Sequence, residues 1–174
     1  MKKTPNTSIL GAVIFFVVIC LVAVAIEALP LTLATPIHET AKYQDSQWST
    51  ACVSDTTQVD NDLKSLTSAA KNYDFTSTST YAAILYKDSH KAIEDSDLYN
   101  VSPDLQGAKD EYQLAMAQAN RVAVYANSGV EEYNNGNFVA INTALKQSIE
   151  CVKSYNEHIK KIVKLSNNYK SKKN

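Results

Sequence analysis

The sequence predicts an all-α protein in which an N-terminal transmembrane helix is followed by an antiparallel bundle of four long helices. Glycine and proline are scarce, with four of each in 174 residues, which suits helices joined by short turns. An uncharged apolar run occupies Ile9 to Ile26. Beyond it, apolar residues recur at spacings of three and four, which is the pattern of a helix with one buried face.

The length and charge of the chain limit what it can be. After the apolar run, roughly 140 residues remain, which is enough for one domain with a single core. The 17 basic residues nearly cancel the 18 acidic ones. The charge balance therefore gives no reason to expect nucleic acid as a partner.

The apolar run is predicted to stay in the lipid bilayer. At about 1.5 Å per residue, Ile9 to Ile26 spans roughly 27 Å, which is close to the thickness of the hydrocarbon core and longer than a typical signal sequence needs. We therefore expect an anchor over residues 9–29. The triplet Ala23-Val24-Ala25 also has the small-x-small form that a signal peptidase accepts, so secretion after cleavage near Ala25 is the alternative.

The flanks of the run predict its orientation. Lys2 and Lys3 precede it, whereas the segment after it is mainly acidic, so the N-terminus should be inside and the domain outside. Pro30 and Pro36 disfavour a helix directly after the anchor. We expect a cytoplasmic N-terminus at 1–8, a tether at 30–39, an extracytoplasmic helical bundle at 40–169 and a basic tail at 170–174.

The first half of the bundle is predicted to hold two helices. Apolar residues from Trp48 to Tyr73 repeat about every 3.5 residues, which predicts a helix over roughly 40–73. The sequence "NYDF" ends it. A weaker pattern from Tyr81 to Tyr99 predicts the second helix, and the sequence "TSTST" before it offers N-caps.

The second half has clearer boundaries. Ser102 can cap a third helix, Pro103 suits its first position, and Asp104 lies favourably at the positive end of the helix dipole. In the sequence "YNNGNF", Gly136 is predicted to end that helix and Asn137 to cap the next one. The fourth helix then carries apolar residues at the same 3.5-residue spacing, from Phe138 to Ile162.

Two cysteines lie outside the apolar run, and they are candidates for a disulfide. Counted along an up-and-down bundle, Cys52 and Cys151 fall roughly 18 and 25 Å from its membrane-proximal ends. Because the two heights are similar, we expect a Cys52–Cys151 bond in an exported domain. Closing a loop of about 100 residues would contribute on the order of 4 to 5 kcal/mol. The alternative is two unpaired buried thiols.

The chain carries no recognisable catalytic or metal-binding motif. His38 lies in the predicted tether, while His90 and His158 lack the helical partners that a zinc or di-iron site uses. No nucleophile elbow, phosphate loop or HExxH sequence is present. We therefore expect no enzymatic activity, no cofactor and no metal ion.

Tyrosine is the unusual residue type, with ten copies. A tyrosine at the edge of a helical core can bury its ring and leave its hydroxyl in water, which explains most of them. The alternative is a ligand groove lined by Tyr81, Tyr112, Tyr125 and Tyr133.

Two surface features suggest further contacts. The C-terminal region is rich in lysine, and if the last helix returns to the membrane, these side chains could meet anionic head groups. They are Lys160, Lys161, Lys164, Lys170, Lys172 and Lys173. The sequence "NVS" at Asn100 is a sequon for N-glycosylation on a predicted exposed turn.

The segment from Ser102 to Ile159 begins "SPDLQGAKDEY" and contains "YNNGNF" before its final helix. It resembles the C-terminal half of small, uncharacterised membrane-anchored helical proteins of methanogenic archaea, which share the S-P-x-L-Q-x-A-K-x-E-Y/F start and the helix turn. The resemblance covers about a third of the chain. It implies the same anchored helical topology and adds no catalytic residue.

Together these observations predict a membrane-anchored extracytoplasmic domain without catalytic activity, which serves as an interaction or cell-envelope module with a protein partner. The alternative is a domain that binds a small molecule or senses stress, like the outer bundles of chemoreceptors. If the apolar run is cleaved, the chain would be a secreted binding protein.

Overall fold

The structure, a computed structural model, describes residues 42–173, without the side chains of Lys172 and Lys173. The predicted cytoplasmic N-terminus (1–8), anchor (9–29) and tether (30–39) lie outside the described residues. Within the described part, no helix is both long enough and apolar enough to cross a membrane.

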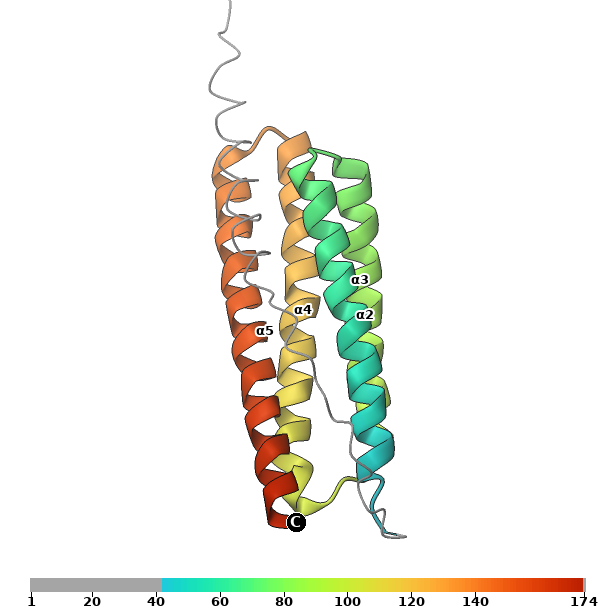
Figure 1. Cartoon of the computed structure of the whole chain (residues 1–174). Helices are drawn as coiled ribbons and strands as arrows, with labels where there is room; N and C mark the ends of the chain where they lie inside the picture. The colour runs from blue at the N-terminus through green and yellow to red at the C-terminus, as the bar shows by residue number, and fades with distance from the viewer. Residues whose placement is uncertain (1–41, 174) are drawn as a thin grey trace, which may run out of the picture.

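Residues 42–173 form four α-helices and no strand, as predicted. The helices are α2 (Asp45–Lys71), α3 (Phe75–Asp97), α4 (Pro103–Asn134) and α5 (Phe138–Lys173). They run alternately up and down (Figure 1). We call the end where α2 begins and α5 finishes the base, and the opposite end, with the 71–75 and 134–138 turns, the tip. Helix α4 packs against α5, α3 and α2.

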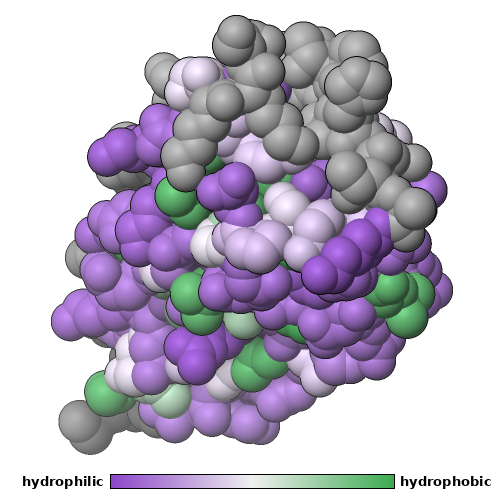
Figure 2. All heavy atoms as spheres, turned by 90° about the horizontal axis from the view of Figure 1, so that it is seen from below, coloured by the Kyte–Doolittle hydropathy of each residue, from purple (hydrophilic) through white to green (hydrophobic). Residues whose placement is uncertain are grey.

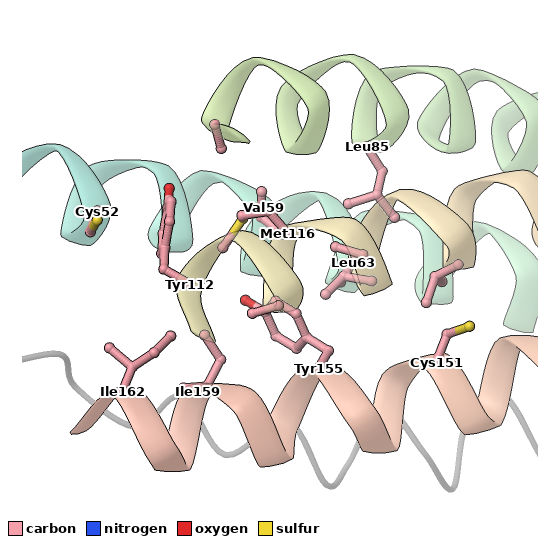
Figure 3. Close-up of a cluster of buried hydrophobic side chains, with 14 of the residues drawn as sticks. Cys52, Val59, Leu63, Leu85, Tyr112, Met116, Cys151, Tyr155, Ile159 and Ile162 are labelled. Atoms are coloured by element: carbon pink, nitrogen blue, oxygen red, sulfur yellow. The ribbon is translucent and has the colours of Figure 1, made fainter. Parts of the chain in front are cut away.

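The core lies along the axis of the bundle and draws side chains from all four helices (Figure 3). Trp48 from α2 donates its indole N–H to the hydroxyl of Ser96 on α3, at 3.1 Å. Its ring also meets Tyr112 of α4 edge to face, at 6.2 Å between centroids. Buried alanines on α4 let neighbouring helices approach closely; they are Ala108, Ala115, Ala119, Ala123 and Ala126.

Two helix starts differ from their predicted positions. Helix α2 begins at Asp45, about one turn after the predicted residue 40. Helix α3 begins at Phe75, before the "TSTST" sequence that was expected to cap it. The cap is Asp74, whose carboxylate accepts the backbone N–H of Ser77 at 2.9 Å. That hydrogen bond lowers the pKa of Asp74, because it favours the ionised carboxylate.

The predicted boundaries of α4 and α5 are confirmed in most respects. Pro103 occupies the first turn of α4. Gly136 has φ of 69°, in the left-handed region where glycine avoids the steric cost of a side chain. The Asn137 side chain accepts the backbone N–H of Ala140 at 3.3 Å and caps α5. Ser102 precedes α4, but its side chain makes no capping hydrogen bond.

One buried carboxylate joins three elements at the base. Asp45, in the first turn of α2, accepts the backbone N–H of Ser102 at 2.7 Å and the hydroxyl of Tyr169 at 2.8 Å. The backbone of Gln44 also donates to the carbonyl of Asn100 at 2.8 Å. The start of α2, the α3–α4 turn and the end of α5 are therefore fixed at the same level.

The structure contradicts the predicted disulfide, because Cys52 and Cys151 are both free and buried. Since α2 starts at Asp45 and α5 reaches Lys173, Cys52 lies about 10 Å and Cys151 about 33 Å from the base. A disulfide needs Cα atoms within about 7 Å of each other. The expected heights were counted from bundle ends at 40 and 169, which made them too similar. Figure 3 shows the two side chains at opposite ends of the cluster.

Candidate functional site

Three tyrosine hydroxyls donate hydrogen bonds to carboxylates on α2. The pairs are Tyr112–Asp55 at 3.1 Å, Tyr155–Asp60 at 2.8 Å and Tyr169–Asp45 at 2.8 Å. Burial raises the pKa of Asp55 and of Asp60, while the tyrosine hydrogen bonds oppose that rise. Burial also raises the pKa of Tyr112 and Tyr155, so both hydroxyls keep their protons. These tyrosines hold helices together.

The predicted tyrosine groove is not formed. Tyr112 is fully buried in the core, whereas Tyr133 lies near the tip and stacks on Phe75 at 4.2 Å between centroids. Tyr112 and Tyr133 are about 32 Å apart along α4. Tyr81 and Tyr125 pack, partly buried, against the main core cluster. Sequence spacing gave no information on how high each ring lies in the bundle.

The interface between α2 and α3 contains a pair of like charges. Asp62 of α2 is only 6% exposed, and its Oδ1 accepts the side-chain amide of Gln58 at 3.0 Å. Its Oδ2 is buried and receives no donor. Burial, followed by the charge of Asp88 on α3, raises the pKa of Asp62 to about 6. The charge of Asp88 therefore acts on Asp62 across the interface.

A polar hollow of about 470 Å³ opens beside this pair. Asp88, Gln58 and Asp55 line it together with Lys91. The ammonium group of Lys91 is bound to the carboxylate of Asp95. The hollow thus combines two carboxylates, Asp55 and Asp88, with one lysine that already has a partner.

The interface between α4 and α5 contains opposite charges. His158 Nδ1 lies 2.5 Å from Glu111 Oε2, and Lys161 Nζ lies 3.4 Å from Glu111 Oε1. The hydrogen bond with His158 lowers the pKa of Glu111. His158 has no metal-site partner on its own helix, as predicted, and its side chain is largely buried against α4. No signal within one helix could reveal this contact, since Glu111 is 47 positions away.

A second hollow, of about 480 Å³, lies between α3 and α4. Its walls are small side chains with the larger Tyr86 and Val124 at the surface. Asn127 and Glu131 add polar groups, and Asn127 donates to Glu131 at 2.9 Å. Its volume falls in the range of small-molecule sites.

Exposed apolar side chains gather at the tip. Those near its two turns are Tyr73, Tyr133, Phe138 and Val139. The base looks different: seen from below, it is mostly hydrophilic with separate hydrophobic residues (Figure 2). Aromatic residues are enriched at protein interfaces, so the tip is the better candidate for a contact surface.

The predicted lysine surface is only partly located at the base. Lys160, Lys161 and Lys164 are exposed on α5, but they lie about 13 to 20 Å from its C-terminal end. They therefore lie along the side of the bundle. Lys170 is half-buried near the base. The side chains of Lys172 and Lys173 are not among those that the structure describes.

The sequon at Asn100 is on an exposed turn, as predicted. Its side-chain amide donates to the carbonyl of Lys42 at 3.0 Å, and the hydroxyl of Ser102 is buried. Both groups that a glycosylating enzyme recognises are therefore engaged or hidden in the folded domain. Glycosylation of Asn100 stays a prediction.

Within residues 42–173, no group of three or more His, Cys, Asp or Glu side chains is arranged to hold a metal ion. Comparisons of the chain with protein-family models, with curated proteins and with solved structures gave no match.

Proposed function

We propose that the chain is a non-catalytic interaction module, held at the outer face of a membrane by residues 9–29, that presents the tip of its bundle to a protein partner in the cell envelope. The observation that carries the proposal is the separation of the two ends. The N-terminal segment leads into the base, and the exposed aromatic side chains gather at the tip.

The geometry gives the tip a reach that suits this role. Helix α2 has 27 residues, so the tip lies about 40 Å beyond the base. Three carboxylates of α2 support this reading, because Asp45, Asp55 and Asp60 accept hydrogen bonds from tyrosine hydroxyls of α4 and α5. Such carboxylates hold neighbouring helices together and so stabilise a scaffold.

Membrane attachment is tested by fractionation and labelling of the full-length chain. We expect it to stay in the membrane pellet after alkaline carbonate extraction. A cysteine in place of the partly exposed Glu132 should react with a membrane-impermeant maleimide in intact cells, and one in place of Thr4 should react only after lysis. The native Cys52 and Cys151 are buried and should give little background. A soluble chain, shortened near Ala25, would instead support a secreted binding protein.

The role of the tip is tested by photo-crosslinking with a matched control. Val139 at the tip is 79% exposed, and Leu98 at the base is 76% exposed. A photo-reactive amino acid at position 139 should give one discrete protein adduct in intact cells, while position 98 should give none. Equal adduct patterns at the two positions would contradict a tip-specific contact.

The α3–α4 hollow favours a second function, which is binding of a small molecule. Its lining of small side chains, with Tyr86 and Asn127 at the edges, could hold a compact ligand with an apolar body. A metabolite screen by thermal unfolding would detect it as a rise in Tm. Ala83→Leu would fill the hollow and should abolish that rise. A screen without any hit leaves the interaction module as the proposed function.

A further inference from the structure

Two turns at the tip end α2 and α4 with the same pair of backbone hydrogen bonds, which is the Schellman motif. In this motif the two residues after the helix cap donate back to carbonyls of the last turn, and the first of the two takes the left-handed conformation. The bonds are Tyr73→Ala70 and Asp74→Ala69, both at 3.1 Å, Gly136→Tyr133 at 3.0 Å and Asn137→Glu132 at 2.9 Å. The two turns therefore share a backbone design and differ in their side chains.

The left-handed position is a glycine in one turn and a tyrosine in the other. Gly136 has φ of 69°, and Tyr73 has φ of 59°. Among residues 42–173, Tyr73 is the only residue other than glycine with a positive φ. A side chain in this region crowds the neighbouring backbone, so tyrosine costs free energy that glycine does not. The turn after α2 therefore carries a strain that the turn after α4 avoids.

The side chain of Tyr73 belongs to the exposed aromatic surface of the tip. It is 47% exposed, and Phe138 and Tyr133 are exposed as well. Tyr133 stacks on Phe75, which follows the same turn as Tyr73. Tyrosine is enriched among the residues that dominate binding at protein interfaces, and strained backbone positions cluster at functional sites. An exposed tyrosine in a strained position is therefore a candidate for a binding role.

The charges beside this aromatic surface are mainly negative. Asp74 follows Tyr73, and Glu131 and Glu132 lie in the last turn of α4. Lys71, in the last turn of α2, offsets one of these charges. Aromatic faces attract guanidinium and ammonium groups through cation–π contacts, and carboxylates attract them as ion pairs. The tip is therefore complementary to a surface that presents arginine or lysine.

We propose that Tyr73 is the main contact residue of the tip, and that it binds a protein partner through arginine or lysine side chains of that partner. This assignment rests on the proposed function, in which the tip faces a protein partner. The turn after α2 loses some stability because it places an aromatic ring where the partner binds. The neighbouring carboxylates favour a basic partner surface over an acidic one.

The cost of the tyrosine is tested by changing the left-handed residue of each turn. Tyr73→Gly should raise the Tm of the full-length chain in detergent micelles by a few degrees, measured by circular dichroism. Gly136→Tyr should lower it by a similar amount, because a Cβ at Gly136 meets no atom within 4 Å and adds only the backbone strain. An unchanged or lower Tm for Tyr73→Gly would mean that the fold itself uses the ring, and would overturn the proposal.

The contact role of Tyr73 is tested in intact cells with the photo-reactive amino acid at position 139. Tyr73→Gly in that chain should lower the yield of the protein adduct by about tenfold, as expected for loss of a dominant contact. Tyr73→Phe keeps the aromatic ring in the same position and should keep most of the adduct. An equal loss of adduct in both variants would contradict a contact made by the aromatic face.

The basic character of the partner is tested with two matched carboxylates of α4. Glu131 accepts the side-chain amide of Asn127 at 2.9 Å, and Asp110, nearer the base, accepts that of Gln106 at 2.8 Å. Both carboxylates are exposed. Glu131→Lys should therefore lower the adduct yield at position 139 severalfold, and Asp110→Lys should leave it unchanged. Equal yields in the two variants would overturn the basic partner surface.

The outcomes also separate this proposal from the function on which it rests. If the chain with the natural Tyr73 gives no adduct at position 139, the tip is not the contact surface and both proposals fail. If the adduct forms and Tyr73→Gly leaves its yield unchanged, the tip remains the contact surface, but Tyr73 is not its main contact residue.

Discussion

The α4–α5 and α2–α3 interfaces are built from similar apolar residues but from opposite arrangements of charge. Between α4 and α5, Glu111 meets His158 and Lys161. Between α2 and α3, Asp62 meets Asp88. The first interface is held by complementary groups at neutral pH. The second interface places two carboxyl groups close together, and the raised pKa of Asp62 makes its stability depend on pH.

The difference shows that an apolar core can tolerate two neighbouring carboxyl groups when the repulsion between them is confined to one level of the bundle. Trp48, Leu85 and Ala92 keep the α2–α3 interface packed, and Trp48 adds a hydrogen bond to Ser96. Asp62 and Asp88 then change the stability of the α2–α3 interface, but the apolar contacts are sufficient for the interface to form.

The largest effect is expected from removing the apolar anchor of the α2–α3 interface. Trp48 is 1% exposed, so Trp48→Ala should lower the free energy of unfolding by about 3 to 5 kcal/mol. Urea unfolding followed by circular dichroism measures this change. Trp48→Phe keeps most of the ring and should cost less. A loss below about 1 kcal/mol for the alanine variant would mean that this interface is not packed as described.

Overpacking should have a smaller effect on α4. Ala115 is fully buried, and a leucine there would force neighbouring side chains and helices apart. Ala115→Leu should therefore destabilise the bundle by about 1 to 3 kcal/mol, measured in the same urea experiment. Ala83→Leu on the exposed surface of α3 is the matched control, with an expected change within about 0.5 kcal/mol. Equal losses for the two variants would contradict close packing around Ala115.

Removing the charge conflict should stabilise the protein. The folded state raises the pKa of Asp62 to about 6, above the value of about 3.9 in an unfolded chain. The folded state therefore binds more protons between these values, and its stability falls as pH rises through that window. Asp62→Asn avoids this loss and offers Asp88 a donor. We expect a gain of about 1 to 2 kcal/mol at pH 7.5, after allowance for solvent screening.

The pH dependence separates this effect from a general one. In urea unfolding at pH 4, Asp62→Asn and the natural chain should have nearly equal stability. Asp110→Asn should match the natural chain at both pH values. A gain for Asp62→Asn that is the same at pH 4 and pH 7.5 would show that the charge of Asp62 is not its cause.

The smallest effect is expected at the α4–α5 ion pair. Contact with His158 lowers the pKa of Glu111, so Glu111 contributes stability that is present above about pH 4.3 and is lost as pH falls through its lower folded-state value. Glu111→Gln should cost about 0.5 to 1 kcal/mol near neutral pH. The difference from the natural chain should narrow in acid. Urea unfolding across pH 3 to 7 measures it, and a constant difference would contradict the ion pair.

The sequence predicted the helices well because their signals are local. The apolar spacing, Pro103, Gly136 and Asn137 each act within a turn or two of the chain, and the structure confirms the number and order of the helices. The start of α3 was missed because Asp74 competes with the nearby serines and threonines as a cap. The start of α2 depends on Asp45, whose partners are distant in sequence.

The functional-site predictions depended on how far along the bundle axis each residue lies and on which residues meet between helices. The spacing of residues along one helix carries no information on either. The Cys52–Cys151 pairing and the tyrosine groove were wrong for this reason. The tyrosine count was nevertheless a useful signal, because the structure uses several of these residues as donors to α2 carboxylates. An excess of both tyrosine and aspartate at buried heptad positions could have suggested such pairs.

The antiparallel arrangement also determines how the bundle responds to force. A load applied between the start of α2 at the base and the 134–138 turn at the tip would run parallel to the helix axes (Figure 1). All the side-chain contacts along an interface would then resist together, as in shear, and would not break one after another as in peeling. The arrangement should therefore resist a load along the helix axes better than a load that peels one helix away from its neighbours.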